Sequence, residues 1–218
     1  MGRPDRRRLA CADALQAEAG FLPALAAPLP VRVPEFEFFG GGVPVYRYLE
    51  GTPLVDEEGG VREFLDALHA FDATGLPVER PDWVDTYRRQ CDEFRRLVFP
   101  LLDPAMRARS EDLFAEVDTL TAFEPAFTHS DLGAEHLLCR RGRLSGVIDW
   151  GDARIGDPAR DYSWLLNGPF PQWDVDDDLR RRARFYHRLA PWFEAHYGVF
   201  TNQPARATAA LRIIEERL

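Results

Sequence analysis

The stretch that decides the fold runs from Phe127 to Trp164 and reads FTHSDLGAEHLLCRRGRLSGVIDWGDARIGDPARDYSW. Its middle predicts a β-hairpin, because apolar runs at Leu137–Cys139 and Leu144–Ile148 flank an Arg141-Gly142 turn. A hairpin returns its two ends to one place, so residues that lie far apart in this stretch can meet there.

Three polar side chains flank the predicted hairpin. Asp131 lies in the loop before the first strand, His136 follows five residues later, and Asp149 ends the second strand. We expect these side chains to converge at one edge of a cleft. Two carboxylates there suit phosphoryl transfer, because one can orient a hydroxyl and accept its proton while the other holds Mg²⁺. The spacing alone leaves a metal-assisted hydrolase as an open alternative.

Composition restricts the class of protein. The chain has 218 residues, 45% of them hydrophobic, which is enough to bury a core as one large domain or two unequal lobes. A net charge of −9 argues against sequence-independent nucleic-acid binding and favours small cationic partners. Three cysteines without metal-type spacing indicate reduced thiols in a cytoplasmic protein. No run of 18 apolar residues is present, so we expect no membrane partner.

The rest of the chain divides near Gly51, where we place a lobe boundary. Before it, apolar spacing predicts a helix over Leu9–Leu25 and strands over Val31–Phe39 and Val43–Leu49. The Gly40-Gly41-Gly42 triplet between the strands is interpreted as a hairpin loop, since no helix follows it to complete a phosphate-binding loop. After the boundary we expect helices over Val61–Ala73, Trp83–Leu101, Pro104–Leu120, Asp178–Tyr197 and Ala205–Leu218.

Two acidic segments have local structural interpretations. Asp157-Pro158 predicts an N-cap that opens a helix through Leu166. The run from Asp174 to Asp178 fits either a pocket for substrate ammonium groups or a helix N-terminus, where carboxylates suit the helix dipole.

Three linked motifs resemble a known family. In order along the chain they are HSDL at His129–Leu132 with His136 after it, VIDW at Val147–Trp150, and GDPARD at Gly156–Asp161. This pattern closely resembles the aminoglycoside phosphotransferase family, whose members are relatives of the protein kinases. The resemblance covers most of the chain, because Tyr46–Leu54 also looks like that family's inter-lobe hinge.

The resemblance implies an α+β, protein-kinase-like fold with two lobes. Residues 1–50 would be the remnant of a small, nucleotide-binding lobe, and residues 51–218 a mainly helical large lobe that carries the catalytic β-hairpin. The implied reaction transfers the γ-phosphate of ATP or GTP, with Mg²⁺, to a hydroxyl of an aminoglycoside-like antibiotic or a related small molecule. The identity of that acceptor and the oligomeric state are left open.

Carried over by position, the resemblance makes Asp131 the catalytic base and Asp149 the principal metal ligand. His136 is assigned to both the catalytic and the metal side. Main-chain groups of the segment Tyr46, Arg47, Tyr48 and Leu49 would meet the purine of the nucleotide. Asp157 and Asp161 look like the family's brace between loop and helix, and His129 is expected to hold the loop by a hydrogen bond to backbone near Asp149.

Two departures from the family pattern bear on activity. Position 136 holds histidine where most of the family has asparagine, and imidazole is a poorer ligand for Mg²⁺ than an amide oxygen. The His136 side chain can instead hydrogen-bond a metal-bound water or Asp131. The sequence contains no lysine, although Glu18 falls where the family's small-lobe helix supplies a glutamate to pair with the phosphate-binding lysine.

The lack of lysine, together with the lack of any segment before Leu9 that could supply them, predicts that the glycine-rich strand pair and the lysine-bearing strand are missing and that the small lobe is truncated. Two explanations follow. Either the start methionine is assigned too far downstream in a complete kinase, or the chain is a catalytically impaired, kinase-derived binding protein, a truncated pseudokinase.

Overall fold

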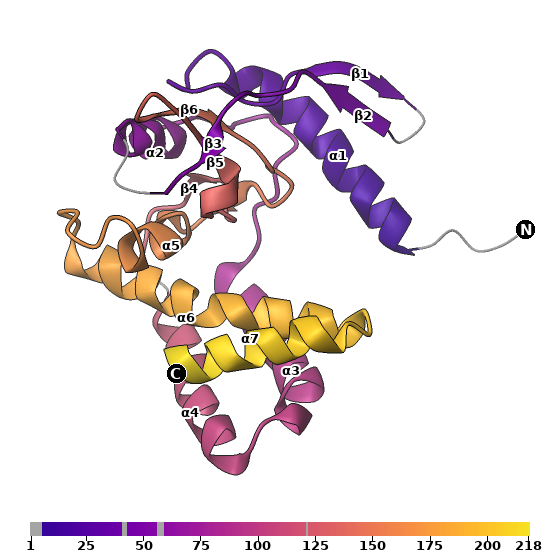
Figure 1. Cartoon of the computed structure of the whole chain (residues 1–218), viewed down its shortest axis with the longest axis vertical. Coiled ribbons are helices and arrows are strands. Elements are labelled where there is room, and N and C mark those ends of the chain that lie inside the picture. Colours follow the sequence, from indigo (N-terminus) through magenta and orange to yellow (C-terminus); the bar gives the residue numbers. More distant parts are fainter. Residues whose placement is uncertain (1–5, 41–42, 56–58, 121) are drawn as a thin grey trace, which may run out of the picture. The chain divides into compact units, whose positions relative to one another are not determined.

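The structure is a computed structural model that describes residues 6–40, 43–55, 59–120 and 122–218 (Figure 1). The chain forms two compact units. The first, here called the sheet unit, comprises Met1–Arg80 and Pro125–Asp161, and the second, the helical unit, comprises Pro81–Glu124 and Tyr162–Leu218. The lobe boundary at Gly51 stays a prediction. None of the described helices is long and apolar enough to cross a membrane.

The described residues of the sheet unit form two α-helices, two 3₁₀ turns and three small antiparallel sheets. Strand orders are β1-β2, β3-β5-β6 and β4-β7. The elements are α1 (Arg6–Leu25), β1 (Phe36–Gly40), β2 (Val43–Tyr46), β3 (Thr52–Pro53), α2 (Val61–His69), β4 (Ala126–Thr128), η3 (Ala134–His136), β5 (Leu137–Arg140), β6 (Arg143–Val147), β7 (Arg154–Gly156) and η4 (Pro158–Arg160).

The predicted hairpin is confirmed as β5 and β6. The strands pair antiparallel from Leu137 opposite Val147 to Arg140 opposite Arg143. The two turn residues, Arg141 and Gly142, have φ angles of 54° and 74°. Positive φ at both central residues is what a two-residue hairpin turn requires, because this geometry matches the right-handed twist of the strands.

A strand that the sequence did not reveal runs beside this hairpin. In β3, Thr52 pairs with Cys139 and Pro53 with Leu138. The preceding Gly51 permits this approach, because a Cβ atom there would lie 2.7 Å from the Leu138 Cβ. The Leu54 N–H then donates to the carbonyl oxygens of Ala134, at 3.1 Å, and Leu137, at 2.9 Å. The chain after Tyr46 is thereby tied to the hairpin.

The strand expected over Val31–Phe39 is wrong in its first half. Regular pairing begins only at Phe36, and Arg32 instead makes an isolated parallel bridge to Gly146 of β6. Pro34 lies between these points and has no N–H to donate to a ladder. The second strand ends at Tyr46, three residues earlier than predicted. Gly41 and Gly42 of the predicted hairpin loop lie outside the described residues.

Aromatic side chains form the core of the sheet unit. Phe64 of α2, Phe127 of β4 and Trp150 are fully buried. The centroid of the Phe127 ring lies 6.4 Å from that of Trp150 and 5.6 Å from that of Phe21 of α1. The indole N–H of Trp150 donates to the Val147 carbonyl at 3.0 Å, which fixes the backbone between the end of β6 and Asp149.

The helical unit contains α3 (Trp83–Leu97), η1 (Phe99–Leu101), α4 (Pro104–Ala115), η2 (Glu116–Thr119), α5 (Tyr162–Asn167), α6 (Asp177–Phe200) and α7 (Pro204–Arg217). Helices α6 and α7 pack side by side (Figure 1). Two predicted helices end early, because their last turns tighten into the 3₁₀ segments η1 and η2. The helix expected after Asp157 begins as η4 and continues as α5.

The acidic run before α6 forms a helix N-terminus. The Asp176 side chain accepts a hydrogen bond from the Leu179 N–H at 2.8 Å, and Asp178 forms ion pairs with Arg181 and Arg182. This capping satisfies an N–H group that the first turn leaves without an intrahelical partner. These carboxylates are therefore engaged within the helix, as one of the two sequence interpretations expects.

A proline inside α6 has a specific compensation. Pro191 has no N–H, so the carbonyl of His187, four residues earlier, loses its helical hydrogen bond. The Arg217 guanidinium of α7 donates to that carbonyl at 2.8 Å. In return, the Arg188 side chain donates to the Arg217 carbonyl at 3.3 Å. The two helices are thus joined by hydrogen bonds at the point where one of them is interrupted.

His187, at this junction, is expected to make the folding stability of the chain sensitive to acid. Burial, and secondly the charge of Arg217, lower the pKa of His187 to about 4. Because the unfolded histidine titrates near 6.5, protons bind preferentially to the unfolded chain below that pH, so the stabilising contribution is lost as pH falls from about 6.5 towards about 4. We expect the free energy of unfolding to fall by about 1 kcal/mol between pH 7 and pH 5, a value that allows for solvent screening.

Urea unfolding of the wild type and of His187→Gln at both pH values measures this contribution. The variant should lose about 1 kcal/mol less than the wild type on acidification. Equal losses in the two proteins would contradict the assignment to His187.

Candidate active site

The loop that carries Asp131 is held by a buried carboxylate. Asp161, fully buried after η4, accepts hydrogen bonds from the backbone N–H groups of His129, at 3.1 Å, and Ser130, at 2.7 Å. Its Oδ2 atom also lies 2.9 Å from Nε2 of His69 on α2. Ser130 has a φ angle of 69°, a left-handed conformation that costs energy in a residue other than glycine. Asp161 thus braces a strained loop, as the sequence predicted.

His129 ties this loop to the end of the hairpin. Its Nε2 atom lies 2.9 Å from the Ile148 carbonyl oxygen, while its Nδ1 accepts a hydrogen bond from the Asp131 N–H at 3.3 Å. A carbonyl can only accept, so Nε2 carries the proton and Nδ1 does not. Burial lowers the pKa of His129, which agrees with this neutral tautomer. The expected hydrogen bond to backbone near Asp149 is confirmed.

The hairpin brings His136 between the two carboxylates. Its Nδ1 donates to the backbone carbonyl of Asp131 at 2.5 Å and lies 4.0 Å from the Asp131 Oδ2. Its Nε2 lies 3.5 Å from the Asp149 Oδ2. The imidazole is 13% exposed, whereas the carboxylates of Asp131 and Asp149 are 57% and 65% exposed. The three side chains converge as the hairpin predicted, and both carboxylates face solvent.

The electrostatic surroundings favour the protonated form of Asp131. Partial withdrawal from water, and next the charge of Asp152, raise the pKa of the Asp131 carboxyl. Arg160 opposes this shift with its positive charge, and its Nε donates to the Ser130 carbonyl at 2.5 Å. A carboxyl with a raised pKa is a stronger proton acceptor once ionised, which suits a general base.

Glu18 of α1 lies beside Asp149. The glycine at position 151 separates them: a Cβ there would lie 3.2 Å from Glu18 Oε1 and 3.9 Å from Asp149 Oδ1. Burial, and secondly the negative charge of Asp149, raise the pKa of Glu18 to about 7. No lysine in the sequence can pair with it. A third carboxyl group, that of Glu18, therefore lies beside the predicted pair of Asp131 and Asp149.

The residues at this position fit Mg²⁺ in part. Mg²⁺ in nucleotide sites is held by one or two carboxylates together with substrate phosphates, rather than by a cage of protein ligands. Asp149 supplies exposed hard oxygen atoms, and no group of three or more metal-ligating side chains occurs among the described residues. Asp149 has a φ angle of 64°, a conformation that is enriched in aspartate. His136 offers a nitrogen, the softer donor.

The segment predicted to meet the purine has accessible main-chain groups. Tyr46 ends β2, and Arg47 forms an exposed ion pair with Glu37 at 3.0 Å. Among the described parts of the chain, no main-chain hydrogen-bond partner occurs for Arg47, Tyr48 or Leu49. The segment could therefore pair with the edge of a base, and its role stays a prediction.

Sequence reasoning missed two residues that position the loop. His69 was not singled out, because its partner Asp161 lies 92 positions away in the sequence. Arg160 lies inside the GDPARD motif, but only the aspartates of that motif were singled out. The position of Arg160 in a recognised motif was the available signal. Nothing local to His69 indicated its partner.

Comparison with known proteins now decides the family. Residues 4–197 match the phosphotransferase enzyme family, which is more than half of the chain. The chain belongs to this family. Viomycin phosphotransferase from Streptomyces vinaceus is 33% identical over 182 residues, a match that covers 72% of this chain and 63% of that enzyme. This phosphotransferase-family chain thus spans less than two thirds of that relative's length.

Solved structures confirm the expected fold. The GDP and kanamycin complex of the aminoglycoside phosphotransferase APH(2″)-IIIa superimposes with a TM-score of 0.83 at 25% identity, covering 94% of this chain and 82% of that one. Macrolide 2′-phosphotransferase MphH from Brachybacterium faecium, at 24% identity, gives a TM-score of 0.72 over 93% of this chain and 80% of its own. The expected α+β, kinase-like fold is therefore that of this phosphotransferase family.

Proposed function

We propose that this chain supplies the base and metal side of a small-molecule kinase. Such an enzyme would transfer the γ-phosphate of ATP or GTP to a hydroxyl of an antibiotic or a related small molecule. The observation that carries the proposal is the convergence of Asp131, His136 and Asp149 around one hairpin within a phosphotransferase-family fold. Phosphoryl transfer depends mainly on positioning and on charge neutralisation by metal ions, and the two exposed carboxylates of this site suit those two roles.

In this proposal Asp131 orients the acceptor hydroxyl and takes its proton. The carboxylate is exposed, so a substrate can reach it, and its loop is fixed by Asp161 and His129. His136 acts as a positioning residue, because its Nδ1–H holds the Asp131 backbone carbonyl. The Nε2 atom of His136 lies 3.5 Å from the Asp149 Oδ2, so the imidazole also borders the proposed metal position.

Asp149 is the proposed metal ligand, with the exposed main chain of residues 46–49 as the proposed purine contact. When bound, Mg²⁺ would neutralise the charge on the transferred phosphate. The pKa of the half-buried Glu18 is raised to about 7, partly by the charge of Asp149, and a cation at this position would favour ionisation of both carboxyl groups. Support for a nucleotide donor comes from relatives solved as complexes with GDP.

The acceptor class follows from the relatives rather than from the site. Those relatives include a viomycin phosphotransferase, a kanamycin complex and a macrolide phosphotransferase. The net charge of −9 favours a cationic acceptor over an anionic one. We therefore propose an antibiotic that carries both hydroxyl and amino groups as the substrate class.

A phosphotransfer assay tests this function. The protein is incubated with γ-labelled ATP or GTP, Mg²⁺ and separately viomycin, kanamycin or a macrolide, and the antibiotic is analysed by mass spectrometry. A mass increase of one phosphate, absent when Asp131→Asn replaces the wild type, supports the proposal. Absence of a phosphorylated product with every acceptor and donor would count against it.

The second candidate function is a catalytically impaired binding protein derived from a kinase. The observation that favours it is that none of these 218 residues is a lysine that could pair with Glu18. Such a protein would bind a nucleotide weakly or not at all, and without the metal dependence of an active kinase.

A further inference from the structure

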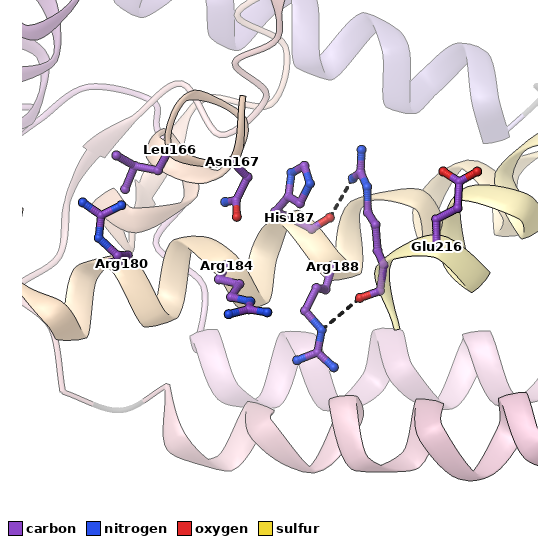
Figure 2. Close-up of a pocket in the computed structure, with 8 residues that line it drawn as sticks. Leu166, Asn167, Arg180, Arg184, His187, Arg188 and Glu216 are labelled. Atoms are coloured by element: carbon purple, nitrogen blue, oxygen red, sulfur yellow. Dashed lines mark hydrogen bonds between the residues drawn. The ribbon is translucent and has the colours of Figure 1, made fainter. Parts of the chain in front are cut away.

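A basic cavity lies within the helical unit and shares no residue with the hairpin site. It has a volume of about 350 Å³ and lies where the end of α5 meets α6 and the last turn of α7 (Figure 2). Its charged lining consists of Arg180, Arg184, His187 and Arg188 from α6, with Glu216 and Arg217 from α7. The lining thus carries four guanidinium groups and one carboxylate around a volume at the lower end of the range for small-molecule sites.

Only part of this positive charge is balanced within the chain. Arg188 forms an ion pair with Glu116 at 2.7 Å. Arg180 donates to the backbone carbonyls of Pro171, at 3.1 Å, and Trp173, at 2.5 Å. Arg217 donates to the His187 carbonyl. Carbonyls accept hydrogen bonds but carry no net charge, so Arg180 and Arg217 are held in place with their charges intact.

Arg184 has the least engaged side chain of the four. Within the described ranges, its guanidinium group has neither a hydrogen bond nor an ion pair, and the residue is exposed. All five of its N–H donors are therefore available. Figure 2 shows Arg180, Arg184 and Arg188 in sequence along α6, from the end nearest Leu166 towards Glu216.

The spacing of these arginines is unfavourable for the helix. Arg180, Arg184 and Arg188 are four residues apart, so successive guanidinium groups are neighbours on one face of α6. Like charges at this spacing destabilise a helix by a few tenths of a kcal/mol per pair. The positive charge of Arg217 also contributes to the lowered pKa of His187. The neutral His187 thus adds no further charge, and the cavity remains net positive.

We propose that this cavity binds a phosphate-bearing small molecule with at least two negative charges. Arginine forks match phosphate oxygens in geometry, and an anion would relieve the repulsion along α6. Arg184 would bind the phosphate directly, while Arg180 and Arg217, fixed by backbone carbonyls, would supply preorganised positive charge. This site does not rest on the proposed kinase function, because it shares no residue with the hairpin site.

Isothermal titration of the full chain with pyrophosphate, in the absence of Mg²⁺, tests the site. We expect saturable binding with one site per chain. Arg184→Ala should raise the Kd by about tenfold or more, because it removes charge-assisted hydrogen bonds. The matched control is Arg109→Ala, which removes an exposed helical arginine of α4 in the same unit and should leave the Kd within about twofold.

A further arm separates this cavity from general anion binding. Sulfate, a dianion without a phosphate group, should bind at least tenfold more weakly than pyrophosphate, since it cannot span several arginines. The proposal is overturned if binding is not saturable, if Arg109→Ala weakens it as much as Arg184→Ala does, or if sulfate binds equally well.

Discussion

Replacing Asp131 by asparagine is expected to lower the kcat of phosphotransfer by about 10² to 10⁴-fold, the usual contribution of a general base. Asparagine has the same size and can keep the backbone hydrogen bonds of the loop, but its amide cannot take a proton from the acceptor hydroxyl. The KM for the nucleotide should change little, because the proposed nucleotide contacts lie at residues 46–49 and Asp149. Steady-state kinetics with the best acceptor of the panel measures both constants.

Asp152→Asn is the matched control for this experiment. Asp152 lies close enough for its charge to raise the pKa of Asp131, but its own carboxylate pairs with Arg154 at 2.9 Å. We expect its kcat to stay within about threefold of the wild type, because a neighbouring charge perturbs a base without replacing it. Equal kcat values for Asp131→Asn and the wild type would remove Asp131 from the mechanism.

Asp161→Ala is expected to cost about 3 to 5 kcal/mol of folding stability, the range found when one partner is removed from a buried ionic network. The substitution leaves the backbone N–H groups of His129 and Ser130, both buried, without their acceptor. It also removes the carboxylate that lies 2.9 Å from the His69 Nε2. Because these groups cannot all reach water, each carries the penalty of an unsatisfied buried donor.

Urea unfolding followed by circular dichroism measures this loss. His69→Ala should cost less than Asp161→Ala, because the carboxylate keeps its two backbone donors. Asp118→Ala is the matched control: this aspartate is exposed and pairs only at the surface with Arg88, so we expect a change below about 1 kcal/mol. A loss for Asp161→Ala as small as that of the control would mean that the loop does not depend on the brace.

Local sequence predicted the hairpin and the meeting of its ends. The turn at Arg141-Gly142, the apolar runs of β5 and β6, and the cap at Asp157 are all determined by residues within a few positions of one another. For this reason the convergence of Asp131, His136 and Asp149 could be inferred before any coordinates were known. The family motifs added the roles of these residues, which geometry alone does not assign.

Other features depend on contacts that local patterns do not encode. The strand β3 has two residues and exists because Gly51 lets the chain approach Leu138. The first half of the strand expected over Val31–Phe39 alternates in sequence but does not form a ladder around Pro34. The cluster of Arg180, Arg184, Arg188 and Arg217 joins two helices, and the sequence showed it only as scattered basic residues.

The central claim, that this chain holds a nucleotide through Mg²⁺ at Asp149, is tested most directly by thermal unfolding with ATP or GTP, with and without Mg²⁺. We predict that nucleotide with Mg²⁺ stabilises the wild type by about 2.7 kcal/mol at a hundredfold excess over Kd. The stabilisation should be much smaller without Mg²⁺ and should be lost in Asp149→Asn. An identical response with and without Mg²⁺, or an undiminished response in Asp149→Asn, would contradict the account.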